Sequence, residues 1–323
     1  MSASLILMVS VCLYLAMGVP VAFALGLSTV TALGLSGNFP MLVVLKETFT
    51  GIDSFPLMAV PFFILAAELM SGGSLTEVLL KFAGQFVGHK RGGLGYTNVV
   101  SLTFFSGISG SALADAAGPG SMLIRMMDKA GYDRAYAAAL TAATAIVGPI
   151  IPPSIGFVIF GVAANVSISK LFLAGIFPGL ILGASLWLMW AWFCRKEQLE
   201  PPPRQTGAQI FKAFTDAGWA LMLPVIILVG LRMGVFTPTE AAVVAAVYAL
   251  FVAAFIYREL SFSQFLDVLR LSARTSAVVM FLVAAAMVSA WMITVAQLPD
   301  QVVGLLQPFL DNPKVLMALI MVL

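Results

Sequence analysis

Long apolar runs, separated by short polar breaks, make up almost the whole chain. Residues 2–35 contain no charged side chain, and other apolar runs cover about 54–70, 171–193, 217–233, 238–257 and 275–296. A helix needs about 20 predominantly apolar residues to cross a bilayer, and patterns typical of membrane strands are absent. The sequence therefore predicts an all-α polytopic membrane protein. The first run predicts either one over-long helix or two short helices broken near Gly18-Val19-Pro20.

Between these runs lie two amphipathic segments and a polar loop. Residues 36–52 are too polar to cross a bilayer, which leaves a helix in the membrane interface or a plain loop. Residues 74–88 are amphipathic and end at the break GHKRGG. The sequence RKEQLEPPPR marks a solvent loop, which we expect over residues 194–215.

Two further segments are apolar but contain helix-breaking residues. The stretch FFSGISGSALADAAGPG, residues 104–120, places small and polar residues inside the apolar segment 97–128. Residues 135–165 are interrupted by GPIIPPS, whose three prolines cannot continue the hydrogen-bond ladder of a helix. We expect 97–128 to form a re-entrant hairpin and 135–165 to form a broken helix.

The distribution of basic residues favours this hairpin. If residues 97–128 enter and leave the membrane on one face, 13 of the 17 Lys and Arg residues lie on that face, and only Lys46, Lys170, Arg232 and Lys314 lie opposite. By the positive-inside rule, the face with thirteen basic residues is cytoplasmic. A complete crossing would weaken this bias, because the basic residues that flank the segment would then lie on opposite sides.

Composition excludes several classes of protein. Hydrophobic residues make up 61% of the chain and charged residues only 10%, which is typical of an integral membrane protein. His89 is the only histidine, so HExxH zinc sites and histidine-based triads are excluded, and no GxxxxGK[ST] motif is present for nucleotide hydrolysis. Cys12 and Cys194 are too few and too far apart to predict a disulfide framework.

Two distant parts of the chain resemble each other. LAMGVPVAFALGLSTVTAL (15–33) matches LRMGVFTPTEAAVVAAVYAL (231–250), and each is followed by an amphipathic segment and then a span, at a spacing of about 216–223 residues. On the topology derived from the charges, the first amphipathic segment lies outside and the second inside. This pattern predicts two inverted repeats, an architecture typical of secondary transporters.

The two interruptions together form the candidate site. In inverted-repeat transporters, broken helices leave carbonyl groups and helix N-termini facing ligands near the middle of the membrane. Carbonyl and hydroxyl oxygens at the hairpin tip (106–111) and at the proline break (144–154) suit a hard cation such as Na⁺. The alternatives are a close helix-packing motif at the tip and an ordinary proline-kinked helix at the break.

Three residues are candidates for binding an anionic substrate. Ser111 and Ser154 precede half-helices, whose N-termini favour anions. Asp115 is an acid at membrane depth and is therefore a candidate as well. Its alternative role is to accept hydrogen bonds from N–H groups in the first turn of the second hairpin helix.

Five motifs resemble the large membrane subunit of tripartite ATP-independent periplasmic (TRAP) transporters over nearly the whole chain: SFPLMAVPFFILAAELM, SGSALAD, GPIIPPSI, SISKLFLAGIFPG and GVFTPTEAA. The resemblance implies a Na⁺ symporter of the ion-transporter superfamily that works as an elevator in the bacterial inner membrane. It also implies a small four-helix membrane partner, a periplasmic substrate-binding protein and a carboxylate substrate. It implies no nucleic-acid partner and no cofactor, with Na⁺ as the coupling ion. GHKRGGLGY, GVAANVSISKLF and MFLVAAAMVSAWMIT are most similar to the sugar-acid, diketogulonate-type branch.

Carried over to this chain, the resemblance implies a sodium site where the hairpin tip meets the proline break. The residues implied are Ser109, Gly110, Ser111, Thr144, Val147, Gly148 and Pro149.

The expected organisation has three parts. Residues 1–193 form the first repeat, 194–215 a cytoplasmic loop and 216–323 an incomplete second repeat. Family members continue with a second hairpin and a second proline-broken helix, so we expect a second sodium site and half of the substrate pocket to need residues beyond 323. The other functions that remain open are an ion-conducting channel lined by the same broken helices and a membrane enzyme, for which Asp115 has no visible catalytic partner.

Overall fold

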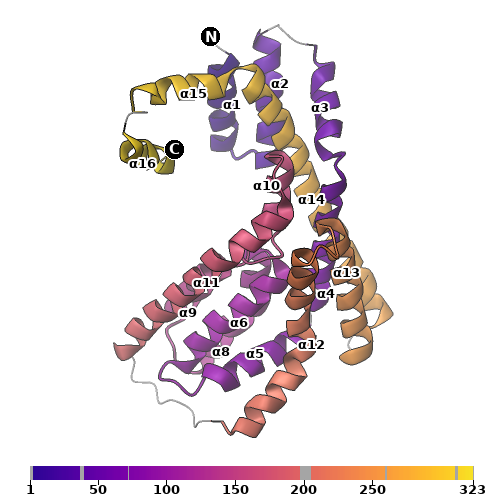
Figure 1. Ribbon diagram of the computed structural model, residues 1–323, viewed down its shortest axis with the longest axis vertical. Helices are drawn as coiled ribbons and strands as arrows, with labels where there is room; N and C mark the ends of the chain where they lie inside the picture. Colours follow the sequence, from indigo (N-terminus) through magenta and orange to yellow (C-terminus); the bar gives the residue numbers. More distant parts are fainter. Residues whose placement is uncertain are drawn as a thin grey trace. The chain divides into compact units, whose positions relative to one another are not determined.

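The computed structural model describes residues 3–36, 40–71, 73–196, 205–258, 260–309 and 312–322, and these residues form helices and turns without strands (Figure 1). The α-helices are α1 (Ala3–Ala16), α2 (Val21–Ser36), α3 (Leu42–Ile52), α4 (Ala59–Met70), α5 (Gly73–Val87), α6 (Gly93–Ser109), α7 (Ala112–Asp115), α8 (Ser121–Lys129), α9 (Arg134–Ala145), α10 (Ile155–Ala163), α11 (Ile168–Phe193), α12 (Gly207–Arg232), α13 (Pro238–Phe251), α14 (Phe262–Val295), α15 (Leu298–Leu306) and α16 (Pro313–Val322). Shorter segments are the 3-10 helices η1 (Phe55–Met58), η3 (Cys194–Lys196) and η5 (Gln307–Phe309), and the π-helices η2 (Ala116–Gly120) and η4 (Val252–Ile256).

Several described helices are long and apolar enough to cross a membrane. These are α11, α12, α13 together with η4, and α14. A further candidate is α3 with the η1–α4 segment, which is bent by 63° at the break between them. This confirms the polytopic, all-helical character that the apolar runs predict.

The chain divides into two compact units. Unit 1 contains Met1–Ser54 and Ala277–Leu323, and unit 2 contains Phe55–Ser276. Each unit therefore contains part of both predicted repeats. The boundaries of the compact units do not coincide with the repeat boundaries predicted from the sequence. The repeats themselves stay a prediction.

In unit 1, the first apolar run forms two short helices, as one of the two alternatives predicted. The chain leaves α1 through Gly18, which has a φ of +77°. The two helices pack on each other, and a buried cluster joins them to the C-terminal part of α14: Ile6, Leu7, Ala32, Leu33 and Met292. The Thr29 hydroxyl lies 3.1 Å from that of Ser289, which adds a polar contact to this packing.

In unit 2, the hairpin helix α6 lies among its neighbours α4, α5, α9, α11 and α12 (Figure 1). Nearly every residue of α6 is buried. The helices α4 and α13 pack along each other, and α5 packs against α12. This arrangement surrounds α6 with protein and positions its C-terminal end, the predicted hairpin tip.

Two loop predictions are revised by the helix boundaries. Residues 42–52 form the helix α3, so the plain-loop alternative for 36–52 is wrong over that range. The predicted loop 194–215 is shorter, because α12 begins at Gly207. Gln209 Oε1 accepts a hydrogen bond from the Thr206 backbone N–H at 2.9 Å, which fixes the start of the helix earlier than hydropathy alone indicates. Residues 197–204 of that loop lie outside the described residues.

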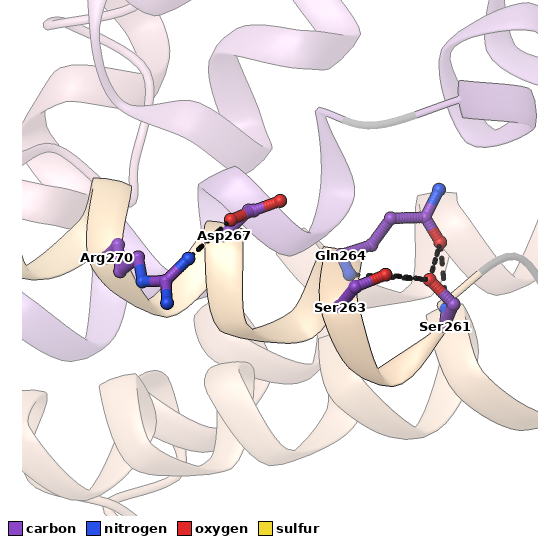
Figure 2. A network of polar contacts seen from close by, with 5 residues as sticks. All are labelled: Ser261, Ser263, Gln264, Asp267 and Arg270. Carbon is purple, nitrogen blue, oxygen red and sulfur yellow. Dashed lines mark hydrogen bonds and ion pairs between the residues drawn. The ribbon is translucent and has the colours of Figure 1, made fainter.

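The second amphipathic segment and the span after it form one continuous helix, α14. Figure 2 shows how this helix begins: Gln264 Oε1 accepts from the Ser261 N–H at 2.8 Å and from its hydroxyl at 2.6 Å. One turn later, Arg270 forms an exposed ion pair with Asp267 at 3.0 Å. The first amphipathic segment differs, because α3 ends before the 63° bend.

The two matching sequence segments share one local feature. Gly18 follows the end of α1 with a φ of +77°, and Gly234 follows the end of α12 with a φ of +71°. Glycine adopts this left-handed conformation at little cost. The matched Met-Gly-Val sequences therefore end a helix in the same way.

Candidate functional site

The predicted hairpin tip is a true helix break. The helix α6 ends at Gly110, which has a φ of +60°. Ser111 is extended and begins α7, with its hydroxyl accepting from the Ala114 N–H at 3.4 Å. The chain then returns through η2 and α8, both of which pack against α6. Residues 97–128 therefore form a hairpin in the structure and not one continuous helix.

The predicted proline break is also present. The helix α9 ends at Ala145, and α10 starts after Ser154, whose hydroxyl accepts from the Phe157 N–H at 3.3 Å. The same hydroxyl donates to the Pro149 carbonyl at 2.6 Å. The Val147 carbonyl accepts from two N–H groups, those of Ile150 and Ile151, at 3.0 Å. Two carbonyl oxygens of the predicted break therefore accept hydrogen bonds inside it. The Pro149 carbonyl has one donor and keeps a lone pair, whereas the Val147 carbonyl has two donors and uses both of its lone pairs.

The tip and the break lie against each other. A Cβ placed on Gly110 would collide with the Pro153 carbonyl oxygen and approach Ser154. A Cβ placed on Gly148 would lie 2.8 Å from Asp115 Oδ2 and 3.1 Å from the Ser111 carbonyl carbon. Only glycine permits both approaches. The tip therefore packs closely, as the helix-packing alternative expects, and this close packing is also what brings polar groups of the tip and the break together.

Asp115 lies at the centre of this contact. Its side chain is 1% exposed, and its carboxylate accepts from the Ser109 hydroxyl at 2.5 Å. The Ser106 hydroxyl, whose single proton points mainly to the Leu102 carbonyl at 2.7 Å, makes a longer contact of 3.4 Å with the carboxylate. Among the described residues, no basic side chain forms an ion pair with it. The predicted alternative, in which this acid satisfies N–H groups of its own first turn, is not what the hydrogen bonds show.

Hydroxyl oxygens surround the carboxylate without neutralising it. Thr144 is fully buried at the end of α9 and donates to the Leu140 carbonyl at 2.8 Å, so the lone pairs of its oxygen stay available. The backbone N–H of Ser111 donates to Ser109 Oγ at 3.2 Å. An ionised carboxylate with only hydroxyl donors would carry an unbalanced buried charge, which is costly unless a cation or a proton balances it. The arrangement is chemically suited to bind a small cation through oxygen atoms.

The half-helices behind Ser111 and Ser154 differ in length. The helix α7 contains only four residues before η2 begins, so the summed dipole behind Ser111 is small. The helix α10 contains nine residues behind Ser154. Of the two predicted anion-binding positions, Ser154 therefore precedes the longer helix and has the larger helix dipole behind it.

One contributing residue was not among the predicted site residues. Ser106 donates toward Asp115 and lies three positions before Ser109 on α6. Residues three apart share a helix face, so this spacing is a signal that could have identified Ser106 from the sequence. The Pro153 carbonyl was not predicted either, because only the folded hairpin brings it to Gly110.

Comparison with known proteins gives one family. Residues 8–323 match the family described as "Tripartite ATP-independent periplasmic transporter, DctM component". The chain is 49% identical over 284 residues to the 2,3-diketo-L-gulonate TRAP transporter large permease protein YiaN of Escherichia coli (strain K12), which covers 88% of this chain and 67% of YiaN. It is 42% identical over 275 residues to the sialic acid TRAP transporter large permease protein SiaM of Vibrio cholerae, which covers 85% of this chain and 64% of SiaM.

A third relative has a longer polypeptide. The isethionate TRAP transporter permease protein DctMQ of Oleidesulfovibrio alaskensis is 38% identical over 291 residues, which cover 90% of this chain and 46% of DctMQ. The chain therefore spans about two thirds of the length of YiaN and SiaM and about half of DctMQ. All three relatives are transporter permeases and not enzymes.

Proposed function

Because the chain belongs to the DctM family of TRAP transporter large permeases, we propose that it is the membrane transport subunit of a Na⁺-coupled, binding-protein-dependent importer of organic acids. The observation that carries the proposal is the contact between the hairpin tip and the proline break around Asp115. Membership of a permease family also sets aside the membrane-enzyme alternative.

The cation site of this proposal uses oxygen atoms from both interruptions. Hard monovalent cations are held by carbonyl, hydroxyl and carboxylate oxygens. Ser109 and Ser111 bring such oxygens from the tip, and Thr144 and Pro149 bring them from the break. The Val147 carbonyl, which accepts from two N–H groups, holds the turn of the break together. Gly110 and Gly148 contribute by letting the two backbones approach.

Asp115 supplies the negative charge of this site. It was predicted as a substrate residue, and its surroundings favour a different role, because a carboxylate repels an anionic substrate and attracts Na⁺. Its hydrogen bonds to Ser106 and Ser109 hold the carboxylate beside Gly148. Bound Na⁺ would balance the buried charge and thereby favour the closed contact of tip and break.

The substrate class follows from the names of the relatives. They transport 2,3-diketo-L-gulonate, sialic acid, C4-dicarboxylates and isethionate, all of which are organic anions. We extend this to a carboxylate, such as a sugar acid, because the diketogulonate permease shares 49% identity over 284 residues with this chain. Ser154, at the start of α10, is the proposed contact for the carboxylate group.

The proposed partners are a small membrane subunit and a periplasmic binding protein, with the complex in a bacterial inner membrane. DctMQ and the sialic acid permease SiaT match this chain over only part of their own length, 46% and 34%. Additional sequence in these permeases is consistent with a second membrane component that works beside this one.

The proposed transport movement is an elevator. The whole proposed cation site lies within unit 2, and the backbone passes between the units at residues 54/55 and 276/277. The crossing points, residues 55 and 277, are 222 positions apart, which falls in the spacing of the two matching sequence segments. In a protein with two inverted repeats, each repeat would contribute one such connection to the mobile unit, and the matching spacing of the two crossings supports this arrangement.

The test is uptake into proteoliposomes that contain the complete permease with its membrane partner, with the binding protein loaded with a radiolabelled sugar acid outside. Uptake is expected only with an inward Na⁺ gradient. For Asp115→Asn, the Na⁺ concentration for half-maximal uptake is expected to rise at least about tenfold, equivalent to about 1.4 kcal/mol, because the amide keeps the size and loses the charge.

The matched control is Asp128→Asn, since Asp128 is an exposed acid of α8 in the same hairpin. It should leave the Na⁺ dependence as in the wild type. Uptake that is equally fast without a Na⁺ gradient would refute the coupling. Normal Na⁺ dependence in Asp115→Asn would remove this carboxylate from the site.

A further inference from the structure

Among the described residues, four buried side-chain oxygens have no protein partner, and one of them, Ser272 Oγ, lies apart on α14. The other three lie on the hairpin helix α6 and on its neighbour α5. Two lie on α6, Asn98 Oδ1 and Ser101 Oγ, and the third is Gln85 Oε1 on α5. The side chains of Asn98 and Ser101 are fully buried, at 0% exposure. Buried polar atoms in native proteins almost always bind a protein group or an ordered solvent molecule. Each of these oxygens therefore calls for an occupant.

The orientation of Asn98 is fixed by its neighbours. The Thr141 hydroxyl donates to the Ala137 carbonyl at 2.7 Å, so its oxygen accepts from Asn98 Nδ2, also at 2.7 Å. The other neighbour of Nδ2 is Met127 Sδ at 3.9 Å, which is likewise an acceptor. The amide nitrogen thus faces α8 and α9, and the amide oxygen is the atom that is left without a partner.

Ser101 differs from the other hydroxyl residues of α6. Thr97, Thr103 and Ser106 each donate to the carbonyl four residues earlier, at 2.7–2.9 Å. Ser101 makes no such bond. Its buried hydroxyl is therefore not satisfied by its own helix.

These atoms share a neighbourhood and a chemistry. Asn98 and Ser101 are three residues apart, which places them on adjacent turns of one helix face. Gln85 follows Gly84, whose Cβ position lies 3.8 Å from the Thr97 methyl group. Each of the three atoms can accept a hydrogen bond, and the described residues contain no buried side-chain N–H group that lacks an acceptor. The fitting occupant is electropositive and small.

We propose that Asn98 Oδ1 and Ser101 Oγ bind a buried water molecule or Na⁺ ion inside the hairpin. Asn98 lies eleven residues before Ser109 on α6, which is about 16 Å at 1.5 Å per residue. The position is therefore separate from the tip. It goes beyond the proposed function and does not depend on it. Neither Asn98 nor Ser101 carries a carboxylate, so the position has no negative charge to balance a divalent ion.

The direct test is a cryo-EM map of the complete permease complex at a resolution that shows ordered water, recorded once in NaCl and once in choline chloride. A peak within hydrogen-bond distance of Asn98 Oδ1 and Ser101 Oγ in both salts identifies water. A peak in NaCl alone identifies Na⁺. The absence of a peak in both salts overturns the proposal.

A second test uses the direction of a stability change. If the site is occupied, Ser101→Ala removes a satisfied hydroxyl, and the melting temperature of the complex should fall by roughly 2 °C or more. If the site is empty, the same change removes an unpaired buried hydroxyl, and the melting temperature should stay equal or rise. That second outcome overturns the proposal.

The matched control is Ser10→Ala. Ser10 is a buried helical serine that is satisfied by the Leu7 carbonyl of its own helix at 3.0 Å. Its replacement removes only a weak bond within its own helix and leaves no second buried side chain without a partner, so it should shift the melting temperature less than Ser101→Ala does. A larger shift for Ser10→Ala would mean that replacing any buried serine lowers the melting temperature, and this result would also count against the proposed site.

Discussion

Gly110 combines two separate constraints at the hairpin tip. Its φ of +60° is left-handed, which costs a residue with a side chain about 1–2 kcal/mol. Its Cα also faces the Pro153 carbonyl so closely that any Cβ would collide with backbone. The first constraint concerns the local turn, and the second concerns the contact of the tip with the break.

We expect Gly110→Ala to reduce Na⁺-driven uptake at least about tenfold while the protein still assembles. The added methyl group would push the tip away from the proline break and open the proposed cation site. The measurement is initial uptake in proteoliposomes, with the amount of assembled complex determined by size-exclusion chromatography.

Gly234→Ala provides the control for backbone strain. Gly234 has a φ of +71°, and no other group lies within 4 Å of its Cβ position. It carries the same left-handed penalty without the collision, so we expect stability to fall slightly and uptake to continue. Equal loss of uptake in both variants would mean that strain alone explains the effect and that the tip contact is not needed.

At the scale of elements, α11 clamps the base of the hairpin. Trp190 is 3% exposed, and its Nε1–H donates to the Gly92 carbonyl at 2.9 Å, directly before α6 begins. Its indole ring also covers Gly95, where a Cβ would collide with the ring. One residue of α11 therefore holds the first turn of α6 through both a hydrogen bond and a close contact.

We expect Trp190→Phe to destabilise the folded protein by about 1 kcal/mol, because the ring contact is largely kept while the hydrogen bond to Gly92 is lost. The loss should appear as a lower melting temperature of the purified complex. Trp192→Phe is the control on the same helix, since Trp192 is 65% exposed. A melting temperature of Trp190→Phe equal to that of Trp192→Phe would contradict the clamp.

Local signals in the sequence were sufficient to predict the helix breaks. Glycine at the tip and three prolines after Gly148 act on their own backbone, so 97–128 and 135–165 could be identified as interrupted without knowledge of tertiary contacts. The sequence left two alternatives for the first apolar run, one helix or two helices divided near Gly18. A glycine permits a break, and packing decides whether it occurs.

Contacts between distant residues could not be predicted in the same way. The hydrogen bonds of Asp115 to Ser106 and Ser109 exist because the hairpin folds back, and residue spacing alone left its role open. The early start of α12 depends on the cap at Thr206, which hydropathy does not detect. Unit 1 combines both ends of the chain and unit 2 is the continuous stretch between them, so this division could not be predicted from the repeat boundaries.

At the scale of the whole molecule, the positions of the basic residues around the hairpin predict the orientation of the protein in the membrane. Lys90 precedes α6 and Lys129 ends α8, so they flank the two ends of the hairpin. Lys170 lies near the start of α11, whose 26 residues extend about 39 Å at 1.5 Å per residue. That length is sufficient to cross a bilayer and to place Lys170 on the face opposite to the end of α11.

Cysteine labelling tests this orientation. In a background with Cys12 and Cys194 replaced by alanine, we expect a membrane-impermeant maleimide to label Lys170→Cys in intact spheroplasts. Lys90→Cys and Lys129→Cys should react only in inside-out vesicles, because the positive-inside rule predicts that both ends of the hairpin lie on the cytoplasmic face. All three lysines are exposed, so differences in reactivity report the side of the membrane and not burial. Labelling of Lys90→Cys and Lys129→Cys from opposite sides would show that the segment crosses the membrane, and the site at its tip would then need a different explanation.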